Sequence, residues 1–276
     1  MRASGDRSFP PGRAVGLRPN MRPGNSHGLA TCVARGRESA QCLNGTDSLN
    51  RRRQRRGYMD IGIWNVRSLG SKEQELVEEA AKYRLDIVGV SETKFKGKGT
   101  RDLENGWKLF YSGLVDPQAH AHAGVGILTS PRMAEQVIEW LPKSERAAVL
   151  RLKAGNRNLA IVQIYAPNDS QEYTAFLDEV TEALETVPPT DSVMLIGDFN
   201  AHVGNDDQTW RGVIGRNGPP DFNHNGRLLL DFCACSGLSI MNTYFQHRDV
   251  HKYTWHRETC GQKSLIDLAV VSTNLR

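Results

Sequence analysis

The sequence of 276 residues is long enough for one large domain or two small ones, and its 39% hydrophobic residues can fill a core. No run approaches the roughly 18 to 20 apolar residues of a membrane-spanning helix, and residues 1–30 contain no apolar segment typical of a secretory signal. We therefore expect an intracellular protein with no membrane partner, and the five scattered cysteines favour reduced thiols over a disulfide framework.

Charge divides the chain near residue 58. Residues 1–58 carry 12 Lys and Arg against 3 Asp and Glu, a net charge of +9, whereas residues 59–276 carry 23 against 28, a net charge of −5. The first segment is rich in Gly, Pro, Ser and Arg and ends in RRRQRR (Arg51 to Arg56), so we expect a disordered basic tail. The basic run is typical of a nuclear-localisation or nucleic-acid-binding segment and favours a nuclear location, but it also fits a solvated arm or sequence upstream of a natural start at Met59.

Compact apolar segments separated by turn residues predict one folded domain over residues 59–276. Helices are expected at residues 71–83, 170–185 and 225–235; the first opens with Ser71 and Gln74 at capping-box spacing, and the last ends near Gly237, where a left-handed cap is favourable. Strands are expected at residues 60–65, 86–91, 107–112, 124–129, 136–140, 147–153, 158–165, 192–197, 238–242, 253–255 and 266–271. This mixture predicts an α/β (α+β) sandwich, with neighbouring strands often antiparallel and helices covering paired sheets.

Polar side chains stand where several of these apolar strands stop. In LIGDFNAHVG (Leu195 to Gly204) a buried-strand pattern ends in Asp198 and Asn200. An Asx turn would explain such residues one at a time, because Asp and Asn bond the backbone in turns. Turns alone would rarely repeat the feature on five separate elements, so we interpret the polar residues as one site: Asn65, Glu92, Tyr165, Asp198 with Asn200, and Asp267.

Six motifs carry a resemblance to a known family: WNVRSL, VGVSETK, QIYAPN, LIGDFNAHVG, YTW and SLIDLAVVS. In this order they resemble the endonuclease/exonuclease/phosphatase superfamily, which includes deoxyribonuclease I and the abasic-site endonucleases. GDFNAHVG and the S-x-I-D motif are most similar to LINE-type retrotransposon endonuclease domains and the related craniofacial development protein 2-like proteins. The resemblance covers residues 59–276 and implies a four-layer sandwich of two mixed, largely antiparallel sheets flanked by helices.

The resemblance also implies metal-dependent hydrolysis of phosphodiester bonds in nucleic acid, expected to be DNA. It implies that Glu92 ligates Mg²⁺ or Mn²⁺ beside Asn65, and that Tyr165 contacts the scissile phosphate. A single strong acid is compatible with Mg²⁺, which prefers oxygen ligands and keeps several waters. Taken alone, Tyr165 would better fit an amphipathic core residue and Asp267 a buried acid bonded to backbone groups, and the ordered set of motifs reverses that preference.

Three further roles concern the reacting atoms. The resemblance implies that Asp198 positions or deprotonates the attacking water, that Asn200 donates to the developing oxyanion, and that Asp267 orients a catalytic histidine. An amide donor aimed at the transition state typically contributes about 3 kcal/mol. His202 and His256 also lie near motifs, but we interpret both as exposed or packed side chains.

A basic segment follows Glu92 in what the sequence indicates is a Gly-containing loop. Its cations could hold a nucleic-acid backbone, which gives salt-dependent, sequence-independent affinity, or could simply be solvated. The candidate nucleic-acid-binding residues are Lys94, Lys96, Lys98 and Arg101.

The sequence departs from the family after the S-x-I-D strand. Family members continue to a closing S-D-H motif, whereas this sequence ends at Arg276 and contains no Asp-His dipeptide. We therefore expect the last strands and the catalytic histidine to be missing, because the chain is a truncated fragment, a degenerate copy or a chain completed by another molecule. Weak or no nuclease activity is expected. The alternative function is a catalytically inactive remnant that binds nucleic acid or protein.

Overall fold

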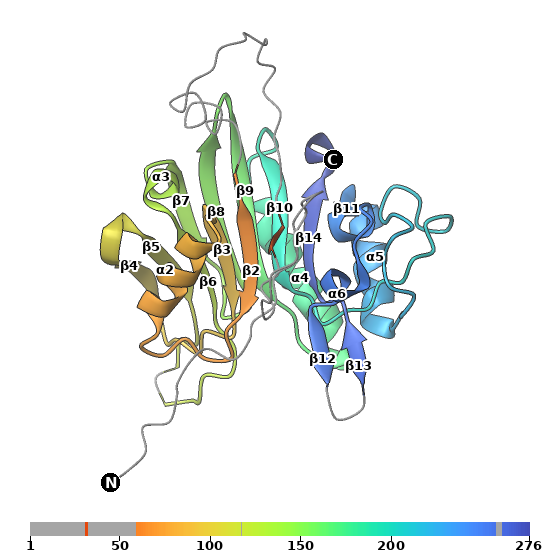
Figure 1. Ribbon diagram of the computed structural model, residues 1–276, viewed down its shortest axis with the longest axis horizontal. Helices are drawn as coiled ribbons and strands as arrows, with labels where there is room; N and C mark the ends of the chain where they lie inside the picture. The colour runs from red at the N-terminus through yellow and green to blue at the C-terminus, as the bar shows by residue number, and fades with distance from the viewer. Residues whose placement is uncertain (1–30, 33–58, 117, 258–260) are drawn as a thin grey trace.

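Two six-stranded sheets pack face to face in the computed structural model, which describes residues 31–32, 59–116, 118–257 and 261–276 (Figure 1). In hydrogen-bonding order the first sheet contains β1 (Thr31–Cys32), β2 (Ile61–Asn65), β3 (Ile87–Ser91), β6 (Val125–Thr129), β5 (Lys108–Ser112) and β4 (Lys98–Asp102). The second sheet contains β11 (Leu238–Ile240), β14 (Asp267–Ser272), β10 (Ser192–Asp198), β9 (Arg157–Tyr165), β8 (Ala147–Ala154) and β7 (Val137–Pro142). β12 (Trp255–Arg257) and β13 (Gln262–Ser264) form a separate hairpin. Apart from β1, the predicted disordered tail lies outside the described residues.

Helices cover the outer faces of both sheets. The apolar face of α2 (Glu73–Lys82) packs on the first sheet, and α4 (Ser170–Glu185) and α5 (His224–Cys235) pack on the second. The shorter helical turns are α3 (Pro131–Ala134), α6 (Asp249–Lys252) and the 3₁₀ turns Glu104–Gly106, Met241–Thr243 and Thr273–Leu275. These four layers confirm the predicted α/β sandwich. Within the described part of the chain, no helix has the length and apolar character needed to cross a membrane.

A buried polar link joins the two sheets below the ends of β3 and β9. All five residues of β3 are buried, because α2 covers one face of the strand and the second sheet covers the other. The sheets approach closely at Gly89, where an added Cβ would lie 2.0 Å from Oε1 of Gln163. Gln163 Nε2 in turn donates to Ser91 Oγ at 3.0 Å. The link therefore fixes one strand end against the other.

Several local predictions differ from the structure. The capping box at Ser71 does not form, because α2 begins at Glu73 and its N-cap residue, Lys72, makes no side-chain capping hydrogen bond. The segment interpreted as a loop contains β4, which pairs with β5. The strand expected at residues 253–255 lies at β12 instead, and α3 and α6 were not expected. The end of α5 matches the prediction, since Gly237 has a left-handed φ of 64°.

Candidate active site at the strand ends

The predicted site residues lie at the same edge of the two sheets. β2 runs parallel to β3, and Asn65, at the end of β2, is the register partner of Ser91, the residue before Glu92. β9 runs parallel to β10, and Tyr165 is the register partner of Asp198. β14 runs antiparallel to β10, so its first residue, Asp267, also pairs with Asp198. The carboxyl ends of parallel strands meet at one edge, and the topology therefore brings these distant segments together.

One carboxamide connects the two carboxylates of the site. Asn65 Nδ2 donates to Glu92 Oε1 at 2.7 Å and to Asp198 Oδ2 at 3.1 Å. The Tyr165 hydroxyl donates to the same Glu92 oxygen at 3.2 Å. Glu92 Oε1 and Asp198 Oδ2 can therefore be no further apart than the sum of the two distances from Asn65 Nδ2. The two carboxylates nevertheless come from different sheets.

Asp198 is a buried acid, with 4% of its surface exposed. Burial raises its pKa to about 6, and the charge of Glu92 contributes to the rise, whereas hydrogen bonds from Asn65 and from the Asn200 backbone N–H oppose it. A pKa near the working pH is favourable for a group that accepts a proton and releases it again. A bound cation would further favour the ionised form.

Glu92 and Tyr165 lie closer to solvent than Asp198. Glu92 has a φ of 56°, a left-handed conformation that a non-glycine residue adopts only when its surroundings enforce it. Tyr165 is partly buried, and burial, followed by the charges of Glu92 and Asp198, raises the pKa of its hydroxyl. The phenol therefore stays protonated at neutral pH and acts as a hydrogen-bond donor.

Asn200 extends the site beyond the end of β10. Its φ of 43° is left-handed, a conformation that Asn tolerates better than most residues. Its backbone N–H donates to Asp198 Oδ1 at 3.1 Å, and its Nδ2 donates to the Ala166 carbonyl at 2.8 Å. An amide carries two N–H donors, so this second bond orients the side chain and leaves one donor for a ligand.

A layer of buried polar residues holds the backbone that follows β10, and the sequence analysis did not identify it. The hydroxyl of Tyr173, in α4, donates to the Phe199 carbonyl at 2.9 Å. Asn225 Nδ2, in α5, donates to the Asn200 carbonyl at 3.2 Å. At Gly226 an added Cβ would lie 1.8 Å from a backbone oxygen of the same segment, so this position must remain glycine. The sequence feature that could have indicated this layer is the N-x-N-G run, residues 223–226, at the start of α5.

The threonine of the YTW motif positions Asp267. Thr254 Oγ1 accepts hydrogen bonds from the backbone N–H groups of Ile266 and Asp267, both at 3.1 Å. Asp267 is 6% exposed and starts β14 opposite Asp198. The structure therefore brings Asp267 to the site, while its proposed action on a histidine stays a prediction.

A cation that the sequence analysis missed lies beside Tyr165. Arg146 Nη1 donates to the Tyr165 carbonyl at 3.4 Å, and the guanidinium lies 5.6 Å from the centre of the phenol ring. Arg146 Nη2 also lies 3.8 Å from a carboxylate oxygen of Glu172, and the Arg146 side chain is 27% exposed. No motif marked this arginine, which stands in the turn before β8.

The basic residues after Glu92 lie in different surroundings. Lys94 and Lys96 are exposed between β3 and β4. Lys98 starts β4, an edge strand, and its Nζ donates to two backbone carbonyl oxygens at and after the end of β7, at 3.1 and 3.0 Å. Arg101 forms an ion pair with Glu73 of α2. The structure thus gives Lys98 and Arg101 intramolecular partners, and a nucleic-acid role for these four residues stays a prediction.

The donor set of the site fits a hard divalent cation. In the part of the chain that the structure describes, no three His, Cys, Asp or Glu side chains cluster in a geometry that could hold a metal ion by themselves. Mg²⁺ does not need such a cluster, because it binds through one or two carboxylates together with water and phosphate oxygens. Glu92 and Asp198, linked through Asn65, offer carboxylate oxygens of that kind.

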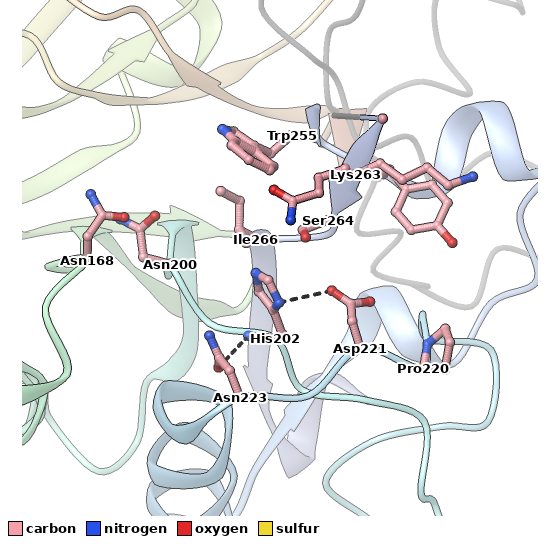
Figure 2. Close-up of a pocket in the computed structure, with 13 residues that line it drawn as sticks. Asn168, Asn200, His202, Pro220, Asp221, Asn223, Trp255, Lys263, Ser264 and Ile266 are labelled. Carbon is pink, nitrogen blue, oxygen red and sulfur yellow. Dashed lines mark hydrogen bonds and ion pairs between the residues drawn. The ribbon is translucent and has the colours of Figure 1, made fainter. Parts of the chain in front are cut away.

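A pocket of about 710 Å³ adjoins the site and shares Asn200 with it (Figure 2). His202 lies in this pocket as a partly exposed side chain, and its Nδ1 is 3.1 Å from Asp221 Oδ2, a partner that the sequence did not indicate. The β12–β13 hairpin supplies part of the opposite wall. Other lining residues are Asn168, Tyr253, Trp255, Lys263 and Ile266.

Comparison with known proteins supports both the sequence motifs and the fold. Residues 62–276 match the Endonuclease/Exonuclease/phosphatase family. Craniofacial development protein 2 of Tragulus javanicus is 34% identical over 199 residues, which make up 71% of this chain and 34% of that protein. The chain thus spans about one third of the length of this curated relative.

Two solved structures share the fold. The endonuclease domain of TRAS1, a telomere-specific non-LTR retrotransposon, superposes with a TM-score of 0.54 and 18% identity, over 78% of this chain and 85% of that one. The 3′ phosphatase NExo from Neisseria, bound to a product DNA hairpin, superposes with a TM-score of 0.50 and 19% identity, over 78% of this chain and 87% of that one. At these identities the likeness concerns the fold.

Proposed function

The chain belongs to the Endonuclease/Exonuclease/phosphatase family, and from that premise we propose that it hydrolyses phosphodiester bonds in nucleic acid with the help of Mg²⁺ or Mn²⁺. We propose DNA as the substrate and an endonuclease of retrotransposon type as the closest functional class. The similarity of the fold to a retrotransposon endonuclease domain supports this proposal.

The observation that carries the proposal is the contact of Asn65 with both carboxylates. Two acids from different sheets accept hydrogen bonds from the same amide, and one of them also accepts a hydrogen bond from a tyrosine hydroxyl. Together these groups form a strongly polar centre at the end of an apolar core. A purely structural site would gain little from placing two negative charges so close together. A cation and a phosphate between them would turn this repulsion into binding energy.

The roles of the side chains follow from their environments. A divalent ion held by Glu92 would neutralise charge on the phosphate. The Tyr165 hydroxyl stays protonated, so with substrate bound it can turn from Glu92 and donate its hydrogen bond to a phosphate oxygen. Asp198 orients the attacking water and takes its proton, and the remaining amide N–H of Asn200 stabilises charge on the phosphate oxygen in the transition state.

Binding of the nucleic-acid backbone requires cations near these groups, since the folded domain is acidic as a whole. Arg146 lies beside Tyr165 and is accessible to solvent, so we propose that it binds a phosphate next to the scissile bond. Lys94 and Lys96 are the exposed cations that follow Glu92 and extend this surface. A nuclear location would agree with such a substrate and with the RRRQRR run.

A plasmid-nicking assay tests the proposed function. We expect slow Mg²⁺-dependent conversion of supercoiled DNA to the nicked form, because the sequence contains no Asp-His dipeptide. EDTA should abolish the conversion, and Asp198→Asn or Glu92→Gln should each lower it at least about a hundredfold. Nicking that persists at the wild-type rate in both variants would come from a contaminating nuclease or from another site, and would contradict the proposal.

A further inference from the structure

A second pair of ionisable side chains faces the same pocket as Asn200. His202 Nδ1 lies 3.1 Å from Asp221 Oδ2, and the two side chains are 31% and 33% exposed. Figure 2 shows the imidazole between Asn200 and Asp221, with its other ring nitrogen turned away from Asp221. A ligand that occupies both the strand-end site and the pocket would therefore meet this ring.

The backbone around the pair is held in place. The His202 N–H donates to Asn223 Oδ1, the Asn223 N–H donates to the His202 carbonyl, and both distances are 3.1 Å. The Gly204 N–H donates to the Asp221 carbonyl at 3.0 Å. These bonds join the segment after β10 to the segment before α5. The imidazole and its carboxylate are thus mounted on supported backbone, as a preorganised binding group should be.

The carboxylate determines what the ring can offer. A carboxylate at Nδ1 fixes the hydrogen at that nitrogen and leaves Nε2 for the ligand. When the ring is an imidazolium it donates through both nitrogens, to Asp221 on one side and to an anion on the other. Lys263 is the other basic residue that lines the pocket, so an anion there would meet the Lys263 ammonium group as well as the His202 ring.

We propose that His202, held by Asp221, donates a hydrogen bond from Nε2 to a phosphate oxygen of the strand next to the scissile phosphodiester. This inference rests on the proposed function, because it takes nucleic acid as the ligand. Its basis is the pocket that Asn200 and His202 share, which links the centre of hydrolysis to the imidazole. His202 acts in binding, and no proton transfer is assigned to it.

Fluorescence anisotropy with a short labelled DNA duplex tests the proposal. The titration is done in EDTA, so that no cleavage interferes. His202→Ala should weaken binding about tenfold, the effect expected for one hydrogen bond to a charged group. His202→Gln should restore most of the affinity, because its amide N–H can replace Nε2, and Asp221→Asn should have an intermediate effect. His224→Ala, which removes an exposed histidine at the start of α5, is the matched control and should leave affinity unchanged.

A second readout identifies the group directly. In a ¹H–¹³C spectrum of the histidine rings, the Cε1–H signal that disappears in His202→Ala should shift when the duplex is added to the wild-type protein. Affinity unchanged in His202→Ala, or no shift of that signal, overturns the proposal, and so does a wild-type protein that does not bind DNA. If the wild-type protein binds through His202 but never cleaves with Mg²⁺, the proposed function fails and this inference stands.

Discussion

The ends of β3 and β10 each carry one carboxylate of the candidate site, but in different environments. Glu92 follows β3 in a left-handed conformation, is only partly buried, and receives its hydrogen bonds from side chains. Asp198 is the last residue of β10, is buried, and receives one of its hydrogen bonds from the backbone. Exposure suits a metal ligand that must exchange water, whereas burial suits a base with a raised pKa.

The two strand ends also differ in what lies behind them. Buried side chains of α4 and α5 bond to the backbone after β10, at Phe199 and Asn200. After β3, the backbone of residue 93 instead exchanges hydrogen bonds with neighbouring loop backbone at Leu69 and Gly124. Similar acids can therefore take different roles when the layers below them differ.

The largest expected effect is that of Asp198→Asn. We expect nicking to fall to the background of the assay, because the wild-type rate is itself expected to be low and Asp198 is the proposed base. The variant should also lack one pH effect on stability. The raised pKa of Asp198 in the folded protein means that its ionisation opposes folding, so wild-type stability is lost as pH rises from the ordinary value of 3.8 towards about 6.

Thermal or urea unfolding of metal-free protein at pH 4.5 and 7.5 measures this effect. The free energy of unfolding of Asp198→Asn, relative to wild type, should rise by about 2 kcal/mol between the two pH values. The exposed Asp178, on α4, provides the control Asp178→Asn, which should show no such difference. A difference in the opposite direction would mean that Asp198 ionises easily in the folded protein.

Glu92→Gln should lower nicking by about a hundredfold or more, because the variant removes a metal-binding charge but keeps the shape of the side chain. Unlike Asp198→Asn, this variant should keep most of the fall in stability between pH 4.5 and 7.5, because it retains Asp198. Its own effect should be a higher Mg²⁺ concentration for half-maximal activity. Glu135→Gln, at an exposed glutamate after α3, is the control. An unchanged Mg²⁺ requirement in Glu92→Gln would contradict the assignment of the metal.

Tyr173→Phe addresses the layer behind β10. Removing the hydroxyl leaves the buried Phe199 carbonyl without this donor, so the protein should lose about 1 to 2 kcal/mol of stability. Nicking should fall about tenfold, mainly in kcat, because Asp198 and Asn200 flank Phe199 and lose their alignment. Tyr83→Phe, at the end of α2, is the control. A loss of stability with wild-type kcat would show that the bond serves the fold alone.

Arg146→Gln should have the smallest effect. Removing one cation that contacts phosphate should weaken DNA binding about fivefold and reduce the salt dependence of binding by about one unit of slope. The control is Arg157→Gln, because Arg157 is exposed and stands at the other end of the strand that ends in Tyr165. Equal salt dependence in Arg146→Gln and wild type would remove Arg146 from the DNA-binding surface.

The structure brings the strand-end residues together, and each of them stood in a local sequence pattern. Asp198 and Asn200 interrupt a buried strand, and Asn65 and Glu92 each follow an apolar run. The sequence predicted largely antiparallel sheets, so we inferred convergence from the repetition of the feature, and the structure adds the parallel pairs β2–β3 and β9–β10 that place these ends at one edge. The family motifs supplied the order of the elements.

Residues whose role depends on tertiary contacts could not be found in this way. Arg146 stands in a turn without a motif, and the pairing of His202 with Asp221 joins residues 19 positions apart. The basic segment after Glu92 looked like a loop because Gly and Lys are poor strand formers, but pairing with β5 made it a strand. Ser71 likewise had capping spacing, but α2 begins after it.

Mn²⁺ binding followed by electron paramagnetic resonance or calorimetry tests most directly whether the strand ends form one metal site. The wild-type protein should bind one Mn²⁺, Glu92→Gln should weaken that binding at least about tenfold, and Glu135→Gln should leave it intact. Mn²⁺ bound as tightly by Glu92→Gln as by wild type would show that the carboxylates at the ends of β3 and β10 are not a metal site.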